Sequence, residues 1–132
     1  MIPTQFGFPI NCKTQRIHDE LHSGKVALRL IAILVAVTLY IIATYRTIPE
    51  ITEIFRTDAE QRAIYPDKPD PKSVHQYWRG IDIVVRGLGA QEHRQIRDWI
   101  NHRFPYGKGN YKTCKYHDAG TGYHLHLQVK AL

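Results

Sequence analysis

The segment SVHQYWRGIDI, from Ser73 to Ile83, contains the start of a predicted strand and two candidate metal ligands, His75 and Asp82. Its second half continues as GIDIVVRG, a run rich in β-branched residues that predicts a strand from Gly80 to Gly87. Asp82 lies inside this apolar run. A buried, unpaired carboxylate is costly, so an aspartate facing the core must be paired or must bind a cation.

Two histidines lie two residues apart in a second strand-like stretch, YHLHLQV, from Tyr123 to Val129. Successive side chains of a strand point to opposite faces, so His124 and His126 share one face. His75 lies seven residues before Asp82. Two histidine nitrogens, one aspartate oxygen and an open water position are typical of a catalytic zinc site. The sequence therefore predicts one zinc ion per chain.

The other segments predict an α+β protein with a small antiparallel sheet of about four strands packed with helices. Alternation in ITEIFRT predicts a strand with Ile51, Glu53 and Phe55 on one face. Thr57 and Glu60 form a capping box, which predicts a short helix after that strand. The remaining expected elements are an irregular arm over residues 1–13, a helix within 14–44, a short helix over 58–65, a helix over 90–104 and a hairpin of strands over 111–117 and 123–129.

The most apolar run, Val26 to Ala43, has two interpretations. Its uncharged part covers residues 30–44, which is shorter than the roughly 20 residues of a spanning helix. We expect a buried helix of a single domain, residues 1–132, whose motif-bearing core is 50–129. The alternative is an inner-membrane anchor through residues 26–43, because basic residues precede the run. We recognise no cleavable signal.

Composition limits the partners of the chain. It has 132 residues and a formal net charge of +6, which favours anionic partners. The basic residues are scattered rather than blocked, so we expect no nucleic-acid partner. The two cysteines, Cys12 and Cys114, are far apart and form no C-x-x-C pair, which excludes a cysteine-based zinc site and indicates reduced thiols.

The combined pattern resembles a known family. S-x-H, six further residues, D-I, and a late H-x-H are together similar to the zinc D-Ala-D-Ala carboxypeptidases and phage endolysins. These belong to the group that joins lysostaphin-like peptidases, D-Ala-D-Ala metallopeptidases and the hedgehog domain. ITEIFRTDAEQRAIY, from Ile51 to Tyr65, is similar to the strand-to-helix entry of that family. The resemblance covers about Glu50 to Val129 and implies a hedgehog or D-Ala-D-Ala-peptidase-like fold.

The resemblance also implies roles for individual residues. It places the zinc ligands on His75, Asp82 and His126. It makes His124 the catalytic histidine beside the metal and Arg56 the group that stabilises the developing oxyanion. The residues that it implies as supports of the site are Ser73, Gln61 and Arg79.

Two places depart from the family pattern. The family usually has Gly-Arg-Ala after the first histidine, where this chain has Trp78, Arg79 and Gly80. Many members carry a glutamate general base three residues before the last zinc histidine, where this chain has Tyr123. A tyrosine is no base at neutral pH. The base is therefore His124, His117 or Asp118, or the protein is not a peptidase. His117 and Asp118 are alternatively substrate-orienting or leaving-group residues, or simply a surface residue and a turn residue.

The expected function is that of a zinc peptidase, bacterial or phage-encoded, that hydrolyses peptidoglycan peptides as a D-Ala-type carboxypeptidase or endopeptidase. We expect a monomer that acts on the cell wall. One alternative is a non-hydrolytic zinc-binding module of a phage particle or envelope. The other is a membrane-anchored basic protein without a metal.

Overall fold

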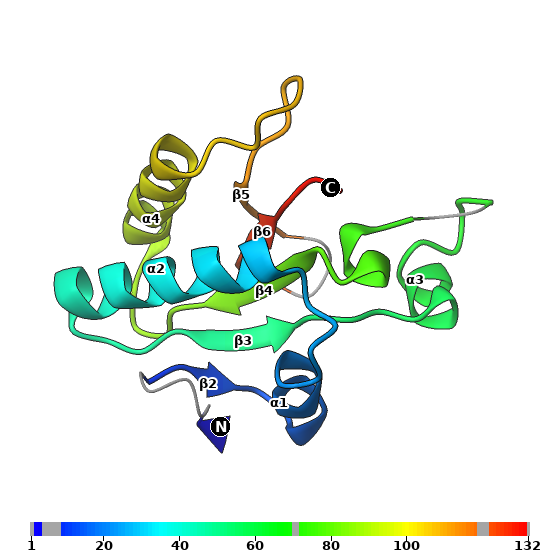
Figure 1. The fold of residues 1–132 in the computed structure, drawn as a ribbon, viewed down its shortest axis with the longest axis horizontal. Coiled ribbons are helices and arrows are strands. Elements are labelled where there is room, and N and C mark those ends of the chain that lie inside the picture. Colours follow the sequence, from blue (N-terminus) through cyan, green and yellow to red (C-terminus); the bar gives the residue numbers. More distant parts are fainter. Residues whose placement is uncertain (1, 4–8, 70–71, 119–121, 132) are drawn as a thin grey trace.

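A mixed six-stranded sheet forms the centre of the protein in a computed structural model that describes residues 2–3, 9–69, 72–118 and 122–131. The strand order is β1-β2-β3-β4-β6-β5 (Figure 1). The β2–β3 pair is parallel and the other pairs are antiparallel. The strands are β1 (Ile2–Pro3), β2 (Asn11–Cys12), β3 (Glu50–Glu53), β4 (Gly80–Val84), β5 (Cys114–Asp118) and β6 (Tyr123–Gln128).

The α+β class is confirmed, but the sheet is larger than the expected four strands. The four longer strands lie in the segments that the sequence predicted. The extra strands come from the expected irregular arm, where β2 pairs with the start of β3. Ile10 and Cys12 are fully buried, so burial of two apolar side chains explains why this arm joins the sheet. Cys12 and Cys114 are both buried free thiols.

The predicted face of Glu53 is wrong because β3 contains a bulge. Ile51 pairs with Ile83, whereas Glu53 pairs with Asp82, so two steps along β3 match one step along β4. An extra residue of this kind switches the side of the sheet on which the following residues lie. Ile51 therefore faces the core, while Glu53 lies on the same face as Asp82.

The expected helix within residues 14–44 is two helices, α1 (Gln15–Leu21) and α2 (Leu28–Tyr45). The hydroxyl of Thr14 caps α1 by accepting from the backbone of Ile17. Gly24 adopts a φ of +80°, a left-handed conformation that suits glycine and separates the helices. The remaining helices are α3 (Asp58–Ile64), α4 (Ala90–Arg103) and the 3₁₀ helix η1 (Val74–Tyr77).

Helix α3 begins where the sequence predicted. Thr57 accepts a hydrogen bond from the backbone of Glu60, and the Glu60 carboxylate accepts one from the backbone of Thr57. The expected hairpin turn between β5 and β6 includes residues 119–121, which lie outside the described residues.

The sheet has two chemically different faces. Helix α2 crosses one of them, with α4 beside it (Figure 1). Ile81 and Ile83 of β4 and Leu125 and Leu127 of β6 are completely buried in the core on that side. Because side chains alternate along a strand, the residues between them point to the other face. That second face carries Asp82, His124 and His126.

Helix α2 packs its inner side on the sheet through residues spaced three and four apart, namely Leu30, Ile33, Leu34, Val37, Thr38 and Ile41. By length and composition the helix could also cross a membrane, since its mean hydropathy over 18 residues is 2.1. Only 33% of that window is buried. The inner side thus agrees with the expected packed helix, and the outer side is left exposed.

Candidate metal centre

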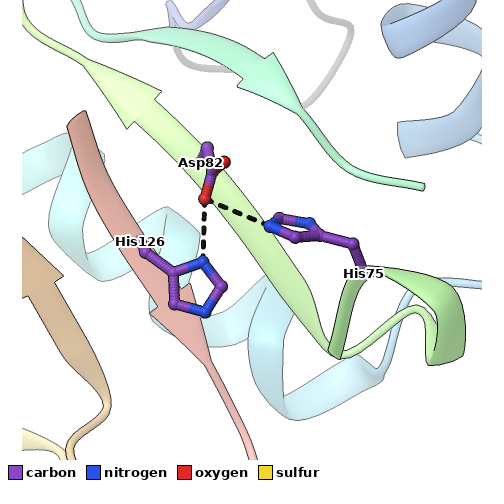
Figure 2. A group of neighbouring side chains, drawn as sticks. All are labelled: His75, Asp82 and His126. Carbon is purple, nitrogen blue, oxygen red and sulfur yellow. Dashed lines mark hydrogen bonds and ion pairs between the residues drawn. The ribbon is translucent and has the colours of Figure 1, made fainter. Parts of the chain in front are cut away.

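Three side chains from different elements converge on the polar face of the sheet (Figure 2). Asp82 on β4 and His126 on β6 are direct partners in the antiparallel register. His75 comes from η1, whose start is fixed by Ser73: the serine hydroxyl accepts from the backbone of His75. The sheet register and one capped turn therefore bring together residues up to 51 positions apart in sequence, from 75 to 126.

The distances define one compact donor set. Asp82 Oδ1 lies 2.8 Å from His126 Nδ1 and 3.3 Å from His75 Nε2. The three donor atoms all lie within 4.8 Å of one another, and all three residues are buried. Among the residues that the structure describes, this is the one such group of histidine, cysteine or carboxylate side chains.

The two histidines present different nitrogens because each has a different hydrogen-bond partner. The Nδ1–H of His75 donates to the carbonyl of Ile54 at 2.9 Å, which leaves Nε2 facing Asp82. The Nε2–H of His126 donates to Gln128 Oε1 at 3.0 Å, which leaves Nδ1 facing Asp82. The amide of Gln128 is oriented in turn, because its nitrogen donates to the carbonyl of Lys112. Such outer partners are the usual way of fixing a metal-binding imidazole.

The electrostatics of the cluster favour a charged Asp82. Burial alone would raise the pKa of Asp82, but hydrogen bonds from His126 and His75 and their positive charge hold it well below its usual range. Burial alone would lower the pKa of His75, yet the hydrogen bond to Asp82 and its charge raise it above the ordinary value. A buried carboxylate facing two imidazoles is a site that a cation could occupy in place of the shared protons.

The donor set fits a metal ion. Two neutral imidazole nitrogens and one carboxylate oxygen match the three protein ligands of catalytic zinc sites. The other nitrogen of each ring is already satisfied, so coordination would leave no buried polar atom of these rings without a partner. The structure thus shows a buried His75, Asp82 and His126 cluster that could bind a metal ion.

Two more histidines lie beside the cluster. His124 donates through Nδ1 to the carbonyl of Gly122 at 3.1 Å, and its Nε2 lies 3.4 Å from Asp82 Oδ2. His117 on β5 is the register partner of His124, and its ring centroid lies 5.0 Å from that of His124 and 5.7 Å from that of His126. Burial, and then the charges of His124 and His126, lower the pKa of His117. Three imidazoles therefore face the Asp82 carboxylate, and the fourth, His117, lies beside two of them.

A cleft of about 140 Å³ opens over the cluster. Arg56 lies in its wall and is buried, with its guanidinium held by Glu53 at 2.9 and 2.5 Å and by Gln61 Oε1 at 2.6 Å. The lining residues are Glu53, Arg56, Ile64, Tyr65, Ser73, His75, Asp82, His117, His124 and His126.

Two further predicted site residues, Arg79 and Asp118, do not line the cleft, and neither does Tyr123, which stands in place of the family's glutamate. Arg79 donates to the carbonyl of Val129 and lies over the ring of Tyr77, so it ties η1 to the end of β6. Asp118 is exposed and accepts from the backbone of Gly122, which closes the end of the hairpin. Tyr123 is exposed and its ring lies beside that of Tyr116, on the face opposite to His124.

Sequence reasoning missed two residues of the centre. Glu53 was expected beside Ile51, and only the bulge in β3 brings it next to Arg56 and into the cleft. Gln128 belongs to none of the sequence motifs, but it follows His126 by two residues, and alternation places it on the same face of the strand. That spacing was the available signal for Gln128, whereas nothing in the sequence marked the bulge.

The fold and the site define an α+β protein with a buried histidine–aspartate cluster at the floor of a cleft. No protein-family model matches the chain, and no curated protein matches it.

Proposed function

We propose that this protein is a zinc-dependent peptidase that hydrolyses peptidoglycan peptide bonds, of the D-Ala-D-Ala carboxypeptidase and endolysin-like type with a hedgehog-like fold. The observation that carries the proposal is that His75, Asp82 and His126 line one cleft. His124 and Arg56 line the same cleft. Structural zinc sites are closed by four protein ligands, whereas three ligands beside a cleft leave room for water and substrate.

A zinc ion bound there would supply a water with a pKa near 7 and would polarise the scissile carbonyl. The chain supplies the proton acceptor. His124 holds its Nδ1–H on the Gly122 carbonyl, so in its neutral form the lone pair of Nε2 faces the cluster. This arrangement lets Nε2 take a proton from the attacking water, which is the role proposed for His124.

Arg56 is proposed to stabilise the developing oxyanion. Its guanidinium is held by Glu53 and Gln61 and therefore needs no rearrangement when charge develops. A guanidinium carries five N–H donors. Glu53 and Gln61 accept hydrogen bonds from three of them, so two donors stay available to a substrate. His117 lies on the opposite strand from His124 and lines the cleft, where it can give a proton to the leaving amine.

The proposed substrate is the peptide of peptidoglycan. The net charge of +6 favours the anionic polymers of a bacterial envelope. A bacterial or phage-encoded monomer that acts on the cell wall is consistent with this charge and with the resemblance of the motifs.

One observation favours a second candidate, a non-hydrolytic zinc-binding module of a phage particle or envelope. Tyr123 takes the place of the usual glutamate, and its side chain lies on the face away from the cluster. If His124 does not act as a base, the centre keeps its metal without turnover.

Metal analysis and hydrolysis together test the proposal. The purified protein is expected to contain one zinc ion per chain and to release peptides or D-alanine from peptidoglycan fragments. His126→Ala should lose both zinc and turnover. A His102→Ala variant is a matched control, since His102 is an exposed histidine on α4 and should keep both. Zinc without turnover would favour the non-hydrolytic module, and a protein that binds no zinc would exclude both candidates.

A further inference from the structure

The outer side of α2 is an uncharged apolar stripe. Leu28, Ala32, Leu39 and Ala43 follow one another at steps of four and seven residues, which places them on one side of the helix. Leu28 is 84% exposed and Leu39 is 52% exposed. No acidic residue occurs between positions 28 and 46. A helix that is apolar on both its inner and its outer side normally has a partner on each side.

Helix α4 shows what a water-facing helix of this chain looks like. It buries His93, Ile96 and Ile100 against the rest of the protein. Its exposed positions are polar or charged at nearly every place: Gln91, Arg94, Gln95, Asp98, His102 and Arg103. The stripe on α2 is therefore a property of that helix and not of the whole surface.

Basic residues surround the stripe. Arg29 and Arg46 are exposed at the two ends of α2. Arg29 donates to the carbonyl of Pro105, and Arg46 is the left-handed residue that ends the helix. Arg103 of α4 lies over the ring of Trp99 at 5.6 Å, next to α2.

Aromatic residues join this basic rim to the helix. Tyr40 stacks on Trp99 with ring centroids 4.1 Å apart, and Tyr45 donates to Gln95. Tyrosine, tryptophan and arginine around an apolar patch are the side chains that suit a membrane–water interface, because each has an apolar body and a polar end.

We propose that the outer side of α2 docks on an anionic lipid surface, with the helix lying in the plane of the headgroups. The stripe would enter the boundary of the acyl chains, and Arg29, Arg46 and Arg103 would contact the anionic headgroups. Charge selects this occupant over a second copy of the chain, because pairing two copies would bring the same arginines close together in two chains of net charge +6.

The packing of the inner side shows why the helix lies on the membrane and does not span it. Leu30, Leu34, Val37 and Ile41 are fully buried against the sheet, and crossing a bilayer would remove them from the core. The metal cluster is on the opposite face of the same sheet, so docking through α2 holds the cleft away from the lipid and open to large substrates.

Vesicle flotation of the purified full chain tests the proposal. The wild-type protein should float with vesicles of phosphatidylcholine containing about one quarter phosphatidylserine, and should bind far less to phosphatidylcholine alone or at high salt. The double variant Leu28→Gln/Leu39→Gln should lower the partition coefficient at least about tenfold. Arg29→Gln should lower it about fivefold on the anionic vesicles.

The control is Ile64→Gln, which removes an exposed apolar side chain from α3 and should leave vesicle binding unchanged. Circular dichroism and zinc content should be unchanged in the Leu28→Gln/Leu39→Gln variant, which separates loss of docking from loss of folding. The proposal is wrong if the wild type floats with neither vesicle. It is equally wrong if the wild type forms a dimer that this double variant abolishes while neither binds lipid, or if only detergent releases the bound protein.

Discussion

Replacing Gln128 by leucine tests how the His126 ring of the candidate metal centre is oriented. Gln128 is buried, accepts from His126 Nε2–H at 3.0 Å and donates to the Lys112 carbonyl at 2.8 Å. Leucine fills a similar volume but can do neither. Without its acceptor, His126 is free to rotate or to place its proton on Nδ1, the nitrogen that should bind the metal. We expect Gln128→Leu to lower the zinc affinity by about 10- to 100-fold, the usual effect of losing such a partner.

The substitution should also lower the free energy of unfolding of the metal-free protein. The buried His126 Nε2–H loses its partner, and an unsatisfied buried group costs about 1–3 kcal/mol. The half-buried bond to the carbonyl of Lys112, an exposed residue, is also lost and is worth about 0.5–1.5 kcal/mol. Added burial of the leucine side chain offsets part of this loss. A net decrease of about 1–3 kcal/mol is therefore expected, measured by urea unfolding.

Gln128→Glu separates the two effects. A carboxylate still accepts from His126 Nε2–H, but it cannot donate to the Lys112 carbonyl. This variant should keep a zinc affinity close to wild type, in competition with a chromophoric chelator, while its unfolding free energy falls. The reasoning is refuted if Gln128→Leu binds zinc as tightly as wild type, or if both variants lose the same amount of affinity.

Three further results are expected. His124→Ala should keep its zinc and lose about 10²–10⁴ in hydrolysis rate, and loss of the metal would instead make His124 a ligand. In the metal-free protein, the raised pKa of His75 stabilises the fold at pH values below 6.5, the ordinary pKa of histidine, and this stabilisation is lost as the pH rises through the pKa of the folded state. The lowered pKa of Asp82 stabilises the fold at pH values above 3.8, the ordinary pKa of aspartate, and this stabilisation is lost on acidification. The lowered pKa of His117 acts in the opposite direction, so the measurement uses a His117→Asn variant. Urea unfolding of this variant should show lower stability at about pH 8 than at about pH 5, and no difference would contradict the pairing. Gly80→Ala should weaken zinc binding, because the added Cβ would lie 2.7 Å from Val74 Cγ2 and 3.2 Å from a nitrogen of the His75 ring. If this crowding is the cause, adding Val74→Ala to the same chain should restore part of the zinc affinity.

The elements that local patterns specify could be predicted from the sequence. The capping box at Thr57 and Glu60, the helical spacing after Ala90 and the alternation around His124 each depend on a few neighbouring residues. The clustering of His75, Asp82 and His126 followed from an aspartate within an apolar strand and from the resemblance of the motifs. These signals predicted that the three residues lie near one another. They did not predict which ring nitrogen of each histidine faces Asp82, or which group accepts a hydrogen bond from the other nitrogen.

The features that were missed depend on contacts between distant segments. The bulge that moves Glu53 onto the face of Asp82 is a property of the β3–β4 register, and the alternating sequence of β3 alone favours the opposite face. Pairing of β2 with β3 likewise needs two segments about 40 positions apart. The break between α1 and α2 also depends on a distant segment. Just before α2 begins, the backbone N–H of Ala27 donates to the carbonyl of Trp78, about 50 positions away, and no local pattern indicates this contact.

The paired histidines of β6 show why sharing a face of a strand does not mean sharing a role. His126 has its register partner in Asp82 and a hydrogen-bond acceptor in Gln128 on the next position of the same face, so its Nδ1 is directed at the carboxylate. His124 lies one step closer to the turn, where the carbonyl of Gly122 takes its Nδ1–H and directs Nε2 at the other oxygen of Asp82. His126 therefore presents Nδ1 to Asp82, whereas His124 presents Nε2. Only His126 belongs to the compact donor set with His75. One strand can thus present a proposed metal ligand and a proposed proton acceptor two residues apart, because the strand register orients His126 and the Gly122 carbonyl orients His124.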